Sequence, residues 1–75
     1  MKMTFHSNEF DIGLGVTRLQ LRNNLTVAEF ADRLGTSRMQ IYRFKDSVDI
    51  KFSVLCQMAD AFDMPVESVL ELCRV

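Results

Sequence analysis

The feature that most constrains the fold is a pair of short amphipathic segments that follow each other closely between residues 26 and 44. Thr26 is a candidate helix N-cap, and Glu29 three residues later completes the pattern of a capping box. Gly35 suits the left-handed backbone that commonly ends a helix. Ser37 then offers a second N-cap. We therefore predict two short helices joined by a turn of about three residues, a connection that suits helices crossing steeply.

Apolar side chains at helical spacing predict which face of each helix is buried. The buried face of the helix over 26–34 is expected to contain Val27, Phe30, Ala31 and Leu34. The buried face of the helix over 37–44 is expected to contain Ile41 and Phe44. Ala31 is small, which allows the two helices to approach closely where they cross. The opposite face of the helix over 37–44 is left free.

A helix is also predicted before this pair, from the N-cap candidate Asp11 to the stop signal Asn23-Asn24. Its inward positions are Ile12, Val16 and Leu19. Leu14 and Leu21 form a second apolar stripe, so this helix is either central in the core or shared between the core and a partner. Gly13 and Gly15 weaken its first turn.

Two more helices are predicted after a polar connection over 45–50. The apolar positions of the first are Phe52, Leu55, Cys56, Ala59 and Phe62. Asp63-Met64-Pro65 interrupts the pattern, and proline suits the first turn of the next helix. That helix has Val66, Val69 and Leu70 on its inward face. No segment alternates as a strand does, so we expect an all-α domain over 11–75 after a short tail or extension over 1–10.

The size and composition fit one small globular domain. The chain has 75 residues, of which 48% are hydrophobic, and this share argues against a disordered chain. Its two cysteines are too few for a disulfide framework, and we expect Cys56 and Cys73 to be buried or half-buried free thiols. Residues 1–10 lack the pattern of a signal peptide, and no run is long enough to span a membrane. A cytoplasmic protein is expected.

The charge is unevenly distributed along the chain. The net charge of −1 is low for a nucleic-acid binder, which normally has a basic surface. Residues 1–45, however, contain seven basic and four acidic side chains, whereas residues 46–75 contain two basic and six acidic ones. This asymmetry is what we expect if one face meets phosphate and another does not.

The stretch LTVAEFADRLGTSRMQIYRFKDS resembles the helix-turn-helix of the Cro and phage-repressor (XRE-like) family. The matching positions are Leu25, Thr26, Glu29, Phe30, Ala31, Leu34, Gly35, Ser37 and Ile41. VLCQMADAFDMPVESVLEL is similar to the fourth and fifth helices of the family, so the resemblance covers about residues 12–72. It implies a compact five-helix, lambda-repressor-like DNA-binding domain in which the second and third helices form the helix-turn-helix.

The resemblance also implies which residues contact DNA, because the third helix of this family lies in the major groove. By position, contacts to bases or phosphates are expected at Ser37, Arg38, Met39, Tyr42 and Arg43. Arg38 is the strongest candidate for reading guanine O6 and N7, and Met39 offers an apolar surface to a thymine methyl. Gln40 either reads adenine or makes a phosphate or intramolecular contact, while Arg43 and Lys45 are expected on phosphates.

Thr26 and Val27, at the start of the helix over 26–34, complete the set of candidate DNA-binding residues. Several of these residues have an alternative role. In the alternative interpretation the arginines are solvated surface residues that contact no DNA. Met39 then fills the core, and Tyr42 packs its ring against the first helix.

Four positions depart from the family pattern. Val27 replaces a glutamine that often contacts phosphate, and Lys45 replaces an acidic residue. Ser47 replaces a glycine, and Asp46 stands where a group that tolerates phosphate would be preferred. These departures leave open a family member that has lost DNA binding.

No catalytic or cofactor-binding pattern is present. His6 is the only histidine, and Cys56 and Cys73 lack metal-ligand spacing, so we expect no metal, no cofactor, no small-molecule substrate and no enzymatic activity.

The resemblance implies a transcriptional regulator of phage or mobile-element type, associated with the nucleoid, that binds a palindromic operator as a homodimer. The alternative is a protein-interaction module, similar to an antirepressor or antitoxin, that binds another regulator instead of DNA or in addition to it. Candidate residues for the dimer or partner surface are Phe5, Phe10, Leu14, Leu21, Glu71, Leu72 and Val75.

Overall fold

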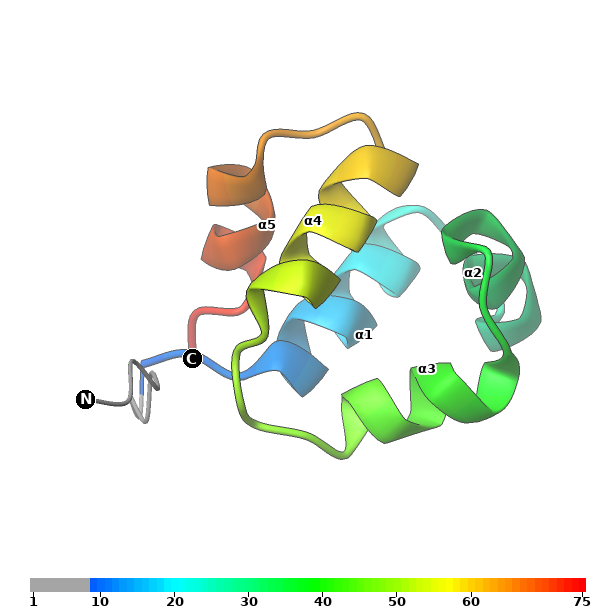
Figure 1. Cartoon of the computed structure of the whole chain (residues 1–75), viewed down its shortest axis with the longest axis horizontal. Helices are drawn as coiled ribbons and strands as arrows, with labels where there is room; N and C mark the ends of the chain where they lie inside the picture. Colours follow the sequence, from blue (N-terminus) through cyan, green and yellow to red (C-terminus); the bar gives the residue numbers. More distant parts are fainter. Residues whose placement is uncertain (1–8) are drawn as a thin grey trace.

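Five α-helices follow one another in the computed structural model, which describes residues 9–75. They are α1 (Ile12–Arg22), α2 (Val27–Leu34), α3 (Arg38–Lys45), α4 (Phe52–Ala61) and α5 (Val66–Leu72) (Figure 1). Within residues 9–75 there is no strand, and an isolated antiparallel bridge joins Phe10 to Arg74. The prediction of an all-helical fold is thus confirmed. None of the described helices has the length and apolar character that crossing a membrane requires.

The first three helices begin at the predicted N-caps. The Asp11 carboxylate accepts a hydrogen bond from the Leu14 amide at 3.2 Å. The Thr26 hydroxyl accepts from the Glu29 amide at 3.1 Å, and the Glu29 carboxylate accepts from the Thr26 amide at 2.8 Å. This reciprocal pair is a complete capping box. The Ser37 hydroxyl likewise accepts from the amide three residues later, at 3.2 Å.

The last two helices begin without a side-chain cap. The N-cap position of α4 is Lys51, and that of α5 is Pro65. Pro65 therefore lies just before the helix, one position earlier than the first turn in which proline was predicted. Its fixed φ, here −67°, still directs the chain into α5.

Residues with positive φ lie at the predicted breaks. Asn24 (φ 55°) follows α1, and Gly35 (φ 73°) ends α2. Asp63 (φ 52°) lies between α4 and α5. At Gly35 no neighbouring atom would obstruct a side chain, so its role is the left-handed backbone itself. The amide after it, at Thr36, donates to the Ala31 carbonyl at 2.9 Å and satisfies one of the last acceptors of α2.

All five helices contribute to one hydrophobic core. The predicted inward residues Ile12, Val16, Leu19, Phe30, Ala31, Leu34, Ile41, Phe44, Leu55, Ala59 and Val69 are buried. Val27, Val66 and Leu70 are partly buried and pack against this core. Cys73 is buried and Cys56 is half-buried, both as free thiols, as predicted. The buried faces of the first three helices were therefore identified correctly from the spacing.

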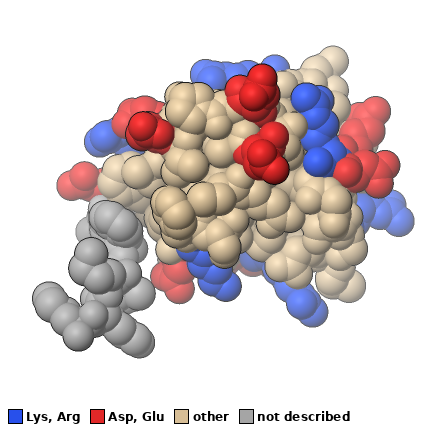
Figure 2. All heavy atoms as spheres, turned by 45° about the horizontal axis from the view of Figure 1, so that its top comes forward, with Lys and Arg blue, Asp and Glu red and all other residues tan. Residues whose placement is uncertain are grey.

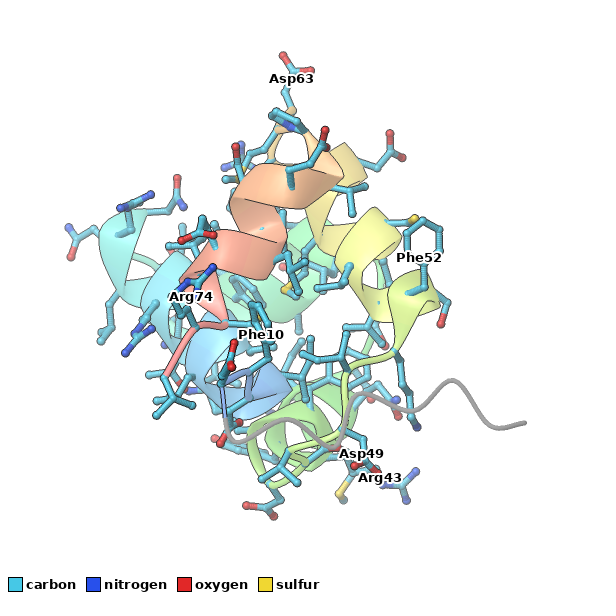
Figure 3. The ribbon with its side chains drawn as sticks, turned by 90° about the vertical axis from the view of Figure 1, so that its left-hand side faces the viewer. Phe10, Arg43, Asp49, Phe52, Asp63 and Arg74 are labelled. Carbon is cyan, nitrogen blue, oxygen red and sulfur yellow. The ribbon has the colours of Figure 1, made fainter. Side chains whose placement is uncertain are left out.

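The predicted inward face of α4 was partly wrong. Phe52 is 70% exposed and lies in the first turn of the helix, pointing away from the body of the molecule (Figure 3). Val54 and Met58, which the prediction omitted, are buried. The buried face of α4 is therefore rotated relative to the predicted one, and Phe52 falls at its edge.

Each of the five helices packs mainly against two others. Helix α1 packs against α3 and α5, while α2 packs against α3 and α4, and α4 packs against α5 (Figure 1). Two polar contacts connect α2 to α4. The Gln57 amide nitrogen donates to the Leu34 carbonyl at 3.1 Å, and Arg33 donates to the Ala61 carbonyl at 3.3 Å. The Arg33 guanidinium also lies 4.6 Å from the centre of the Phe62 ring.

The two glycines of α1 lie where other parts of the chain come closest. A Cβ atom at Gly13 would collide with the backbone carbonyl of Lys45, at the end of α3. A Cβ atom at Gly15 would collide with the Sγ atom of Cys73, just after α5. The Gly13 amide also donates to the Ser47 carbonyl at 3.1 Å. The lower helix propensity of these glycines is offset by the close packing that they allow.

The two ends of the described chain are paired. The Val75 amide donates to the Glu9 carbonyl and the Asp11 amide donates to the Cys73 carbonyl, each at 2.8 Å. The Arg74 guanidinium lies 5.2 Å from the centre of the Phe10 ring (Figure 3). Residues 9 and 10 of the predicted tail are thus attached to the domain. Phe5 and His6 lie outside the described residues.

Candidate nucleic-acid interface

Helix α3 is anchored through one face only. Ile41 is fully buried, and Phe44 is 8% exposed. These two side chains hold the helix against α1 and α2, its main packing neighbours. Helix α2 runs in a clearly different direction from α3 and does not cover its outer face. That face therefore lies at the surface of the molecule (Figure 1).

Most of the predicted site residues lie on this outer face. The exposed members are Ser37, Arg38, Met39, Tyr42 and Arg43, whereas Gln40 and Lys45 are half-buried. Met39 is 64% exposed, so it does not fill the core. Tyr42 is 52% exposed, so its side chain is only partly covered, and its packing against α1 stays a prediction. The structure therefore brings together seven of the nine candidates on α3 and its cap.

The other two candidates lie at the start of α2. The Thr26 hydroxyl is engaged in the capping box, and the Thr26 side chain is exposed. Val27 is half-buried and packs against the hydrophobic core. It therefore has no polar group to offer a phosphate beyond its backbone.

The charges of α3 are of one sign. Arg38, Arg43 and Lys45 are basic, and the helix contains no acidic residue. Neither arginine forms a hydrogen bond or an ion pair with the part of the chain that the structure describes. The ion pair within residues 9–75 joins Arg74 to Glu71 at 3.1 Å and does not involve α3. Two basic groups thus remain available for an external anion.

Acidic side chains are found on other helices. In the view that brings the top of Figure 1 forward, Asp and Glu lie both near the middle and around the edge, among Lys and Arg (Figure 2). Helix α5 contributes Glu67 and Glu71 and no basic residue. The net charge of −1 therefore conceals a basic α3 and an acidic α5.

A shallow hollow lies beside α3, with a volume of about 230 Å³. It is bounded by α3, the start of α1 and the 46–54 segment, and its polar side chains are Gln40, Arg43, Ser47, Asp49 and Lys51. Arg43 and Asp49 lie close together in Figure 3. Gln40 is half-buried and lines this hollow, so it lies at the side of α3 and not in the middle of its exposed face.

Lys51 is a basic residue near α3 that the sequence reasoning did not select. The polar connection predicted over 45–50 ends just before Lys51, and the apolar positions of the next predicted helix begin at Phe52, so Lys51 was given no role. Its position beside Arg43 arises only when the chain turns back after α3, so helical spacing within α3 gives no signal for it.

No three His, Cys, Asp or Glu side chains of residues 9–75 come together in a way that would hold a metal ion. Burial raises the pKa of the Cys73 thiol to about 11, and the nearby Asp11 carboxylate adds to the shift. This thiol is therefore protonated and unreactive at neutral pH.

In comparisons with known proteins, no protein-family model, curated protein sequence or solved structure matches this chain. The resemblance to the Cro and phage-repressor family stays a prediction that rests on the residues themselves.

Proposed function

We propose that this chain is a sequence-specific DNA-binding transcriptional regulator that reads the major groove through α3, with α2 and α3 acting as a helix-turn-helix. One observation carries the proposal. The outer face of α3 is exposed and contains Arg38 and Arg43, the helix has no acidic residue, and two buried residues on the opposite face anchor it. The helix docks on DNA without disturbing the core, as a recognition helix must.

The residues of α3 divide into two roles. Arg38, in the first turn, reads guanine through its O6 and N7 atoms. Arg43 and Lys45, in the last turn, bind phosphates and set the register of the protein on the duplex. Ser37 caps the helix and lies beside the backbone of the DNA, as does Thr26 at the start of α2.

A homodimer reading a palindromic operator completes the proposal. Two copies of α3 would enter successive major grooves about 34 Å apart. Among the described candidates for the surface between the copies, Leu21 and Val75 are the apolar ones that are exposed, at 68% and 70%, whereas Phe10, Leu14 and Leu72 are half-buried. In this function the chain has no enzymatic activity and needs no cofactor.

The experiment that tests the proposal is selection of bound sequences from a pool of random duplexes, at low and moderate salt. An enriched palindromic motif whose binding weakens as salt rises supports it, because phosphate contacts release counterions. Absence of enrichment at both salt concentrations overturns it for this chain.

Variants identify the reading helix. Arg38→Ala is expected to relax the motif at one position of each half-site and to reduce affinity by about 1–3 kcal/mol. Arg43→Ala is expected to weaken binding to all sequences alike and to reduce the salt slope by about 1. Arg22→Ala is the matched control, since Arg22 is an exposed arginine at the last position of α1. It is expected to leave the motif unchanged.

A second candidate function is binding to another regulatory protein. The observation that favours it is the exposure of large apolar side chains outside α3, at Leu21, Val48 and Phe52. Binding of this kind responds weakly to salt, whereas phosphate-driven binding responds steeply. A pull-down whose captured partner is lost in Phe52→Ala but kept in Arg38→Ala favours this second function.

A further inference from the structure

The middle of the outer face of α3 is apolar. Successive residues of an α-helix lie about 100° apart around its axis. Relative to the midpoint of the buried Ile41 and Phe44, Met39 lies about 170° away. Tyr42 and Arg43 lie about 130° away, on either side of it. Arg38 lies only about 90° away, at the edge of the face. Met39 is therefore the residue that points most directly away from the core.

The exposures agree with this geometry. Met39 is 64% exposed and Tyr42 is 52% exposed. Ser37 caps the helix through the Gln40 amide at 3.2 Å, and the buried Ile41 fixes the opposite face. Met39 is thus an exposed apolar side chain on a firmly held helix, which is how a recognition residue is best presented.

The charges around Met39 identify the kind of occupant. Arg38 and Arg43 lie on either side of Met39 on the exposed part of the helix, and α3 has no acidic residue. This arrangement favours a polyanion over an apolar protein surface. The apolar group that a DNA duplex presents in its major groove is the C5 methyl of thymine. A thioether side chain is flexible and polarisable, and so adapts to such a contact.

We infer that Met39 is the central specificity-determining residue and that it recognises the C5 methyl of a thymine in the major groove. This inference rests on the proposed function and makes it more specific. It moves the centre of sequence recognition from Arg38 to an apolar contact, with Arg38 reading a base pair at the edge. The amide of Gln40, which lines the hollow beside α3, takes no part in base reading.

The test uses the operator obtained by selection. Each thymine is replaced in turn by deoxyuridine, which lacks only the C5 methyl, and affinity is measured by fluorescence anisotropy at fixed salt. For the natural chain we expect the affinity to fall about fourfold when one particular thymine of each half-site is replaced. This is the change in affinity that corresponds to burying one methyl group. Met39→Gln is expected to abolish this sensitivity, and Met39→Leu, which stays apolar, is expected to keep it.

The outcomes separate this inference from the proposed function. If no thymine methyl of a selected operator matters, or if Met39→Gln retains the sensitivity, the inference is overturned while the proposed function stands. If selection enriches no sequence, both are overturned. Because Met39 is largely exposed, both variants should fold, and circular dichroism with thermal unfolding checks this.

Discussion

At the scale of single residues, Gly15 marks the closest approach between α1 and the end of the chain. Replacing a helical glycine by alanine normally stabilises a helix by up to about 1 kcal/mol. Here the new Cβ atom would collide with the Cys73 Sγ atom. We therefore expect Gly15→Ala to lower the free energy of unfolding by about 1–3 kcal/mol, the usual cost of overpacking. Urea denaturation measures the change.

A double variant tests the cause of that loss. Cys73→Ala removes the Sγ atom that the new Cβ would meet. The combined Gly15→Ala and Cys73→Ala variant should therefore lose less stability than the two single variants together. Simple additivity would show that the contact with Cys73 is not the reason.

Cys73 also makes the stability depend on pH. Burial raises the pKa of its thiol from 9.0 to about 11, so the unfolded chain loses this proton more readily than the folded one. The contribution to stability is complete below pH 9 and is lost as pH rises toward 11. We expect about 1 kcal/mol less stability at pH 10 than at pH 8. Urea denaturation at both pH values should show this difference in the natural chain, and Cys73→Ala should lack that part of it.

At the scale of helices, the capping box of α2 is a separable contribution to stability. Thr26→Ala removes the acceptor of the Glu29 amide, and we expect the free energy of unfolding to fall by about 1 kcal/mol. Thr26→Ser keeps the hydroxyl and is the matched control. An equal loss in both variants would mean that the hydroxyl does not cap the helix. Thermal unfolding of the two variants side by side decides this.

Helix existence and most helix ends were predictable because they depend on local chemistry. Asp11, Thr26 and Ser37 cap helices through bonds to residues only three positions away. Such short-range bonds are visible in the sequence. The same holds for Gly35, whose left-handed conformation is required by the turn and not by a distant neighbour.

What the sequence could not supply are the long-range contacts. The glycines of α1 were predicted to weaken the helix, and their second role became visible only when Lys45 and Cys73 were found beside them. The position of Phe52 was predicted wrongly because Val54 and Met58 determine which side of α4 is buried. The residue types on α3 were predictable, whereas the central place of Met39 on its exposed face follows from the burial of Ile41 and Phe44.

At the scale of the whole molecule, Arg18 connects the middle of α1 to the end of the chain. Its guanidinium donates to the Leu72 carbonyl at 3.0 Å and also to the Arg74 carbonyl. The Leu72 carbonyl is the last of α5 and has no partner within the helix, and Arg74 lies beyond the helix end. We expect Arg18→Ala to cost about 1 kcal/mol and to speed amide hydrogen exchange at residues 73–75.

The control for this prediction is on the same helix. Arg22 is also exposed, and none of its contacts reaches α5. Arg22→Ala should leave exchange at residues 73–75 unchanged. If both variants speed exchange there equally, the effect arises from the loss of charge and not from the bonds of Arg18.

The pairing of residues 9–11 with residues 73–75 also has a practical consequence. Both segments lie on one side of the molecule, and the N-terminal end of α3 lies on the other (Figure 1). A fluorophore, a fusion partner or a surface anchor joined after Val75 would therefore stand away from Ser37 and Arg38. Immobilising the protein through that end would leave the first turn of α3 open to an approaching duplex.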